Sequence, residues 1–315
     1  MTHMQTAAVT DIGSRRSTSS VAVRSVTAGS IATGWWKFVV PITLAVSLLY
    51  FLPLLINVYL AFSNWSGFHN RVEFIGLDNF RTLFTQYNLL AQVRLTFTYA
   101  ITASLVGNLL ALALALALEE NSVTNQIFRA VFFIPVLLSP LASGYVWAGI
   151  LDPAGPLNQG ISVFSGGFDF AWLGSRSLAI YLVAAVDAWK WLGFFTLVYI
   201  AGLSTVPLEL KETATSMGAN AWQVFRHAKL PFLAPAMTYN ITVTLIGAMS
   251  TFDIILATTR GGPGNATRVL NVLTLDQFGI GYFGLASTTQ LVVTILITIT
   301  AIPLVRFLRS RELEG

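Results

Sequence analysis

Six long apolar stretches constrain this chain more than any other feature of its sequence. They lie near residues 35–62, 92–118, 127–150, 178–203, 233–257 and 285–308. A helix needs about 20 mostly apolar residues to cross the hydrocarbon layer of a bilayer, and each stretch reaches that length with few charges. We therefore expect an all-α integral membrane protein, with a six-helix transmembrane domain over residues 34–310.

Composition supports a lipid-solvated chain. Of its 315 residues, 55% are hydrophobic and only 10% charged, whereas soluble domains have roughly 25% charged residues. The absence of cysteine excludes a disulfide framework, a thiolate metal site and a cysteine nucleophile. Residues 1–33 are rich in Ser, Thr, Ala and Val without the apolar core of a signal peptide, so we expect a disordered cytoplasmic tail there, and a short cytoplasmic C-terminus at 311–315.

The basic residues indicate orientation rather than nucleic-acid binding, although the net charge is +4. Cytoplasmic loops of membrane proteins hold the excess of Lys and Arg. With the N-terminus inside, eleven of the eighteen basic residues fall on the cytoplasmic side: Arg15, Arg16, Arg24, Lys37, Arg129, Lys211, Arg226, Lys229, Arg306, Arg309 and Arg311. We expect both termini to be cytoplasmic, with membrane lipid as a partner and no nucleic acid.

A patterned polar segment at about 204–231, here called the 204–231 segment, separates the fourth and fifth spans. Pro207 suits a helix start, and Gly218 can adopt the left-handed conformation that ends a helix. Asn220 and Gln223 form a capping-box pattern for a second short helix, which we expect to run to Leu230. Pro231 then discourages continuation. Two short cytoplasmic helices meeting at a glycine hinge are expected.

The second of these helices has an aromatic face. Trp222 and Phe225 are three residues apart and so lie on one side, while Gly218 and Ala219 leave the turn with almost no side-chain bulk. A partner surface could therefore approach closely at the turn.

The spacing of this segment resembles the EAA loop of inner-membrane permeases of binding-protein-dependent ABC importers. The resemblance rests on Glu212-Thr213-Ala214, Gly218-Ala219, Phe225 and Leu230-Pro231. It implies that these residues form coupling helices seated on a nucleotide-binding subunit, the coupling set being Glu212, Ala214, Gly218, Ala219, Phe225, Leu230 and Pro231. Thr213 and Met217 depart from the family pattern, which usually has alanine and aspartate at these positions.

Further stretches resemble the carbohydrate (maltose-type) branch of that family: 74–80, 260–263, 281–282 and 286–287. The resemblance implies a bacterial-type plasma membrane permease for a sugar or oligosaccharide. It also implies three kinds of partner: a second homologous permease subunit, two nucleotide-binding ATPase subunits and an extracytoplasmic solute-binding protein. The outer loops near 63–91, 151–177 and 258–284 are the expected dock for the last of these.

Ionisable residues within a span usually face a cavity or a partner. Asp187 and Lys190 are three apart in the fourth span, on one face, and are able to neutralise each other. An internal ion pair that holds the bundle together is the alternative to a substrate-facing role. Pro135 and Pro140 are expected to break the third span, and broken helices often line cavities.

The resemblance implies substrate contacts from the fourth, fifth and third spans. The candidate pathway residues are Asp187, Trp189, Lys190, Ser250, Thr251, Asp253, Val136 and Ser139. For Ser250 and Thr251, hydrogen bonds to carbonyls of their own helix are the alternative to substrate contact.

The sequence offers no catalytic constellation. It has no G-x-x-x-x-G-K-[ST] phosphate loop, and its three histidines, His3, His69 and His227, are far apart. We therefore expect a non-enzymatic chain that binds no cofactor or metal, with ATP and Mg on partner ATPase subunits. An ion-coupled secondary transporter, an enzyme acting on lipid, and import of a non-sugar solute such as a glycerophosphate remain as alternatives.

Overall fold

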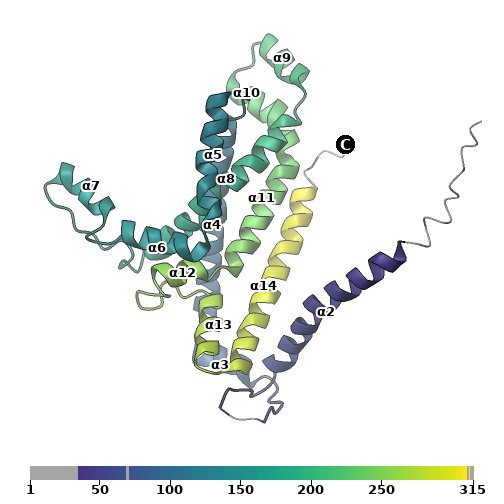
Figure 1. Ribbon diagram of the computed structural model, residues 1–315, viewed down its shortest axis with the longest axis vertical. Helices are drawn as coiled ribbons and strands as arrows, with labels where there is room; N and C mark the ends of the chain where they lie inside the picture. The colour runs from purple at the N-terminus through teal and green to yellow at the C-terminus, as the bar shows by residue number, and fades with distance from the viewer. Residues whose placement is uncertain (1–34, 69–70, 311, 313–315) are drawn as a thin grey trace, which may run out of the picture. The chain divides into compact units, whose positions relative to one another are not determined.

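The computed structural model describes residues 35–68, 71–310 and 312. Its helices are α2 (Trp36–Ala61), α3 (Asp78–Thr85), α4 (Leu89–Ala117), α5 (Val123–Leu137), α6 (Pro140–Ile150), α7 (Pro156–Ser165), α8 (Ala179–Ser204), α9 (Leu208–Ser216), α10 (Ala221–Val224), the π-helical turn η1 (Phe225–Lys229), α11 (Leu230–Ser250), α12 (Asp253–Thr258), α13 (Leu270–Gly279) and α14 (Phe283–Arg309) (Figure 1). The tail expected at 1–33, and all of the expected C-terminus 311–315 except Glu312, lie outside the described residues.

The chain divides into two units, residues 1–53 and 54–315. The described part of the first is the beginning of α2, an apolar helix that contains Pro41 and Pro53. The second unit contains the remaining helices and the buried cores.

The spans expected from the sequence are largely confirmed. Among the described residues, five helical stretches are long and apolar enough to cross a membrane: α2, α4, α8, the continuous stretch from α10 to α11, and α14. The sixth is present if α5 and α6 count as one span, because together they meet the same criterion but are bent by 101°.

The break in the third span lies at Leu138 and Ser139. The Ser139 hydroxyl accepts a hydrogen bond from the Ala142 N–H at 3.1 Å, which caps α6, and Pro140 is the first residue of that helix. Pro135 stays within α5. The predicted break is therefore confirmed at Pro140, whereas Pro135 does not break α5.

The fifth span differs from the prediction of one helix over 233–257. α11 ends at Ser250, Thr251 is extended, and α12 begins at Asp253. The Ser250 and Thr251 hydroxyls donate to the carbonyls of Ile246 and Gly247, at 3.0 and 3.1 Å. Both hydroxyls are thus satisfied by carbonyls of their own helix.

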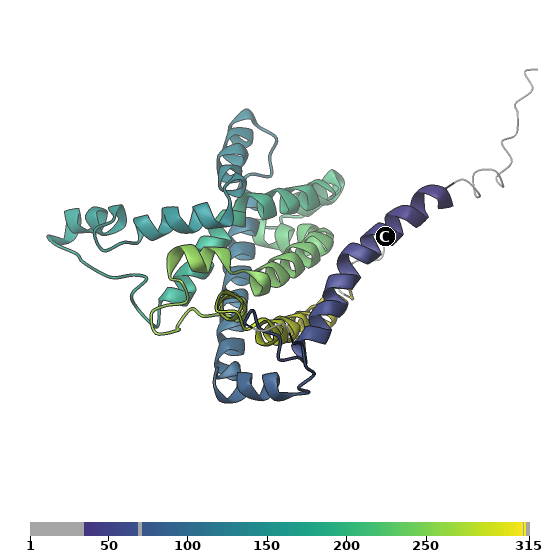
Figure 2. The same ribbon diagram turned by 60° about the horizontal axis from the view of Figure 1, so that its bottom comes forward.

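Small residues allow the central helices to approach closely. α4 packs along α8 and α11, and α5 also packs against α8 (Figures 1 and 2). A Cβ placed on Gly193 of α8 would lie 2.3 Å from the Phe132 carbonyl oxygen of α5, and one on Gly144 of α6 would lie 2.5 Å from the Ala257 Cβ of α12. Such contacts between small residues are typical of helix association in membranes.

The two ends of the second unit carry different connections. The α4–α5 turn, the 204–231 segment and the C-terminal end of α14 lie toward one end, where Figure 1 labels α9 and α10. α3, the start of α4 and α13 lie toward the opposite end. This sorting matches the alternation of loops that the sequence predicts.

Candidate functional site

The first helix of the 204–231 segment ends as predicted. Gly218 has a φ of +81° directly after the C-cap Met217. The Ala219 N–H donates to the Ala214 carbonyl at 3.0 Å, and the Gly218 N–H donates to the Thr215 carbonyl at 2.9 Å. This pair of bonds is the Schellman motif, and it needs a residue that tolerates positive φ. The reversal at Gly218 therefore follows from the sequence.

The second helix begins as predicted. Asn220 and Gln223 exchange hydrogen bonds of 2.9 and 2.8 Å between side chain and backbone, which forms a capping box. The rings of Trp222 and Phe225 are 5.5 Å apart, so they share one face of the helix.

The expected end of this helix at Leu230 is wrong. α10, η1 and α11 form one continuous helical stretch, Ala221–Ser250. Pro231 is accommodated in the first turn of α11 because the preceding turn is π-helical: the Leu230 N–H donates to the Phe225 carbonyl, five residues back. Pro231 has no N–H to place in this ladder, and the wider turn relieves the crowding that its ring causes in a regular α-helix.

The seven predicted coupling residues fall into two groups. Glu212 and Gly218 are exposed, and Ala214 and Ala219 are partly exposed beside them. Phe225, Leu230 and Pro231 are partly buried where the stretch enters the helix bundle. The segment thus has a projecting tip and an anchored base.

Large apolar side chains at the tip are exposed, and sequence reasoning missed Met217 and Leu208 among them. Met217, Leu208 and Trp222 are 82%, 66% and 64% exposed, and α9 has no buried residue. Met217 drew attention only as a departure from a pattern. An exposed apolar cluster on a projecting segment is typical of an interaction surface.

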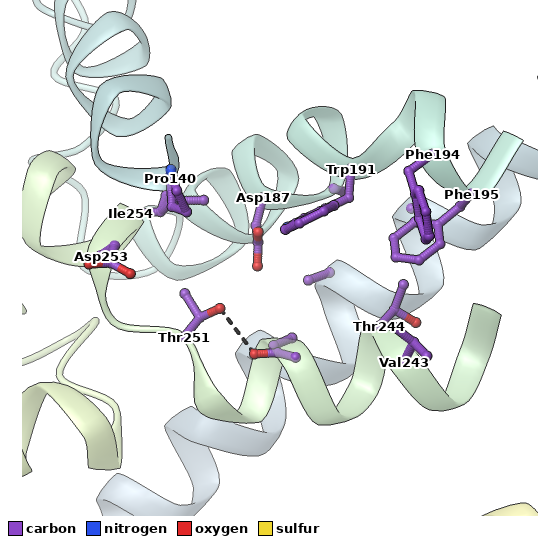
Figure 3. Close-up of a pocket in the computed structure, with 15 residues that line it drawn as sticks. Pro140, Asp187, Trp191, Phe194, Phe195, Val243, Thr244, Thr251, Asp253 and Ile254 are labelled. Atoms are coloured by element: carbon purple, nitrogen blue, oxygen red, sulfur yellow. Dashed lines mark hydrogen bonds between the residues drawn. The ribbon is translucent and has the colours of Figure 1, made fainter. Parts of the chain in front are cut away.

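A cavity of about 180 Å³ lies between α4, α8 and α11, closed on one side by the starts of α6 and α12 (Figure 3). It is lined by Ala103, Gly107, Pro140, Asp187, Ala188, Trp191, Phe194, Phe195, Val243, Thr244, Gly247, Ala248, Thr251, Asp253 and Ile254. Three predicted pathway residues, Asp187, Thr251 and Asp253, therefore line one space.

Asp187 and Lys190 do not neutralise each other by direct contact. Asp187 is 5% exposed, its carboxylate points into the cavity (Figure 3), and its Oδ2 accepts a hydrogen bond from the Tyr99 hydroxyl at 3.0 Å. The Lys190 Nζ lies 3.4 Å from the Val136 carbonyl oxygen and 4.0 Å from the centre of the Trp191 ring. The carbonyl beside the helix break and the aromatic face draw the ammonium away from the carboxylate.

The remaining predicted pathway residues are elsewhere. Trp189 packs edge-on against Trp147, with ring centres 5.4 Å apart. Ser139 caps α6, and Val136 contributes the carbonyl that binds Lys190. Ser250 lines a separate pocket with Asn271 and Gln290. The structure therefore divides the predicted set among the cavity, its supports and a second pocket.

A buried polar network beside the cavity was missed. It joins Ser104 and Asn108 of α4 with Tyr199 of α8 and Thr244 of α11. The Asn108 amide donates to Thr244 Oγ1 at 2.9 Å and its Oδ1 accepts from the Tyr199 hydroxyl at 2.7 Å, while Ser104 and Thr244 share a bond of 2.9 Å. Polar residues four apart within apolar spans, as at Ser104 and Asn108, were the available signal for an interior face.

The sequence of this chain is similar to a known protein family and to several known proteins. Residues 107–312 match the family of binding-protein-dependent transport system inner membrane components. The probable starch degradation products transport system permease protein AmyD of Thermoanaerobacterium thermosulfurigenes is 27% identical over 89% of this chain and 95% of its own length. The probable ABC transporter permease protein YurN of Bacillus subtilis is 32% identical over 89% of this chain and 97% of its own length.

Two further similarities concern an archaeal relative and a solved structure. The trehalose/maltose transport system permease protein MalF of Thermococcus litoralis is 26% identical over 87% of this chain and 94% of its own length. A chain of a bacterial ABC transporter that imports the polysaccharide alginate superimposes with a TM-score of 0.76 at 20% identity, covering 90% of this chain and 98% of that one. This last similarity concerns the fold. The family match over 107–312 and the relatives above 30% identity show that this chain is a member of the family of inner membrane components of binding-protein-dependent transport systems, the permease subunits of ABC importers.

Proposed function

We propose that this chain forms half of a transmembrane pathway for a sugar or oligosaccharide, driven by ATP that separate nucleotide-binding subunits bind with Mg and hydrolyse. The chain itself holds no cofactor in this proposal. Relatives named for starch products, multiple sugars and trehalose/maltose support the substrate class. Membership of a binding-protein-dependent family argues against the ion-coupled transporter and the lipid enzyme.

The exposed tip of the 204–231 segment is the observation that carries the proposal. Its apolar side chains Met217, Leu208 and Trp222 are mostly exposed within the described chain. Burying such side chains against a protein partner is favourable, at roughly 25 cal/mol for each Å² removed from water. We assign the nucleotide-binding subunit as that partner, with Glu212 and Gly218 at the point of contact.

The size of the cavity supports a pathway shared with a second, homologous permease subunit. Sites that enclose small molecules usually measure about 300–1,000 Å³, and this cavity has about 180 Å³. The cavity of one chain is therefore small for an oligosaccharide, and in our proposal a second permease subunit supplies the rest of the enclosure.

The charge of the cavity favours a neutral solute. Its lining includes the carboxylates of Asp187 and Asp253 and no basic side chain. An anionic solute such as a glycerophosphate would meet repulsion in a site of low dielectric constant. The ring faces of Trp191, Phe194 and Phe195 supply apolar contact surface of the kind that binding sites combine with a few polar groups.

The orientation of the chain in the membrane is also part of the proposal. We place the end with the 204–231 segment in the cytoplasm of a bacterial-type plasma membrane, together with both termini. The loops near 63–91, 151–177 and 258–284 would then be extracytoplasmic and would receive a solute-binding protein. The excess of Lys and Arg in the segments placed inside supports this assignment.

Single cysteines test the ATPase contact directly, because the natural chain has none. Met217→Cys should react with a maleimide in the isolated permease and be protected in the purified complex with its ATPase subunits. Phe164→Cys is the matched control: its parent side chain is 93% exposed, on α7, and it should react equally in both samples. Equal reaction of Met217→Cys with and without the ATPase would contradict the proposed contact.

A further inference from the structure

An ion pair joins two segments that are far apart in sequence. The Lys229 Nζ lies 2.6 Å from Glu119 Oε1 and 2.8 Å from Glu119 Oε2, across 110 residues of chain. The two side chains are only 16% and 21% exposed. A pair that is this shielded and that engages both carboxylate oxygens is less screened by solvent than a surface pair.

Each partner of the pair has a defined place in the fold. Lys229 is the last residue of η1, at the base of the 204–231 segment. Glu119 lies in the turn between α4 and α5, two residues after α4 ends at Ala117. The pair therefore connects the base of the projecting segment to the turn between two other helices.

The α4–α5 turn is itself held together by Arg129 of α5. Its guanidinium donates to the carbonyl oxygens of Leu118, Glu119 and Glu120, with distances of 3.1 Å from Nε to Leu118 and of 3.2 and 3.1 Å from Nη2 to the other two. A cation at the carboxyl end of a helix also interacts favourably with the helix dipole. Consequently Arg129 holds the end of α4, the turn at 118–122 and α5 together, and we call this unit, which includes Glu119, the α4–α5 corner.

The other end of η1 is anchored by packing. Phe225, its first residue, packs against a buried apolar cluster that includes Leu118, Leu203 and Leu233. The π-helical turn is thus held by an apolar contact at one end and by the ion pair at the other. Single π-helical turns within α-helices are frequent at functional sites.

We propose that Glu119 and Lys229 are positioning residues that transmit the displacement of the 204–231 segment to α4 and α5. This inference rests on the proposed function, because the ATPase subunits are what would displace the segment. Without the pair, η1 can move relative to the α4–α5 corner. ATP hydrolysis then continues while fewer solute molecules cross for each ATP consumed.

The test uses the complete complex in proteoliposomes and measures solute uptake and ATP hydrolysis in the same sample. Glu119→Gln and Lys229→Gln, which keep side-chain length approximately, should each lower the uptake per ATP about 5-fold, the change that about 1 kcal/mol of coupling produces. Lys229→Arg should retain most of the ratio. The exchange Glu119→Lys with Lys229→Glu should recover much of what either charge reversal alone loses.

Glu120→Gln is the matched control, since Glu120 is the next residue, is exposed, and its carboxylate makes no hydrogen bond or ion pair within the described chain. It should behave as the wild type. Wild-type uptake per ATP in both Gln variants, or an exchange variant no better than the single reversals, would overturn the inference. Absence of ATP-dependent uptake by the wild type would instead overturn the proposed function, so the two failures are distinguishable.

Discussion

The Tyr99 hydroxyl donates a hydrogen bond of 3.0 Å to Asp187 Oδ2 and so joins α4 to α8 beside the cavity. Both side chains are buried, at 0% and 5% exposed. Tyr99→Phe removes the donor and leaves the carboxylate less well satisfied, which costs roughly 1–3 kcal/mol when the group is buried. We expect a lower thermal-unfolding midpoint of the purified permease in detergent.

Tyr181→Phe controls for the loss of a hydroxyl. Tyr181 is also on α8, is 49% exposed, and its hydroxyl makes no hydrogen bond within the described chain. Its midpoint should equal that of the wild type. Equal midpoints for all three proteins would show that the Tyr99–Asp187 bond does not stabilise the bundle.

Filling the cavity should block uptake without unfolding the protein. A Cβ on Gly247 meets no atom within 4 Å, and Gly247 lines the cavity, so the side chain of Gly247→Leu has room to occupy it. We expect little change in stability and at least a 10-fold loss of uptake rate, because a substituted side chain would occupy the solute's space; 10-fold corresponds to about 1.4 kcal/mol. Gly149→Leu, equally open but on α6 outside the cavity, should transport normally. Normal uptake by Gly247→Leu would exclude this cavity from the pathway.

Two Gly→Ala substitutions should change the stability in opposite directions, because one lies in the close α5–α8 contact and the other in open space. Gly193→Ala forces a Cβ to within 2.3 Å of the Phe132 carbonyl oxygen, and such overpacking costs about 1–3 kcal/mol. Gly149→Ala meets open space in a helix interior, where alanine is favoured by roughly 0.5–1 kcal/mol. Unfolding midpoints in detergent should move down for the first and up for the second. A rise or no change for Gly193→Ala would contradict the close approach.

Two substitutions at Gly218 distinguish the role of the backbone turn from the role of the open surface around it. Asparagine tolerates positive φ, so Gly218→Asn should keep the turn and retain ATPase binding. Gly218→Trp adds both backbone strain and bulk to a site that is now open, and we expect it to abolish co-purification with the ATPase while membrane insertion is unchanged. Charge reversal at Glu212 should weaken co-purification more mildly. Undiminished co-purification of Gly218→Trp would exclude the turn from the interface.

The spans and caps could be predicted because their signals are local. Length and apolarity identify a span, and the caps at Gly218 and Asn220 depend on residues within one turn of chain. The end of α11 at Ser250 was missed because the sequence stays largely apolar up to Ala257, where the chain forms the separate short helix α12.

The partners of buried polar groups could not be predicted. Sequence spacing placed Asp187 and Lys190 on one face, but Tyr99 is 88 residues from Asp187 and Val136 is 54 residues from Lys190. The helical path through Pro231 was missed because a π-helical turn precedes it, in which the Leu230 N–H donates to the Phe225 carbonyl. For Asp187 and Lys190, tertiary contacts decided the partners.

Uptake by proteoliposomes that contain this chain, its partner permease, the ATPase subunits and the solute-binding protein tests the central claim most directly. We predict saccharide accumulation that requires ATP and stops when the ATPase subunits are omitted or cannot hydrolyse ATP. Uptake that persists without ATP, or that follows an imposed ion gradient instead, would contradict the account.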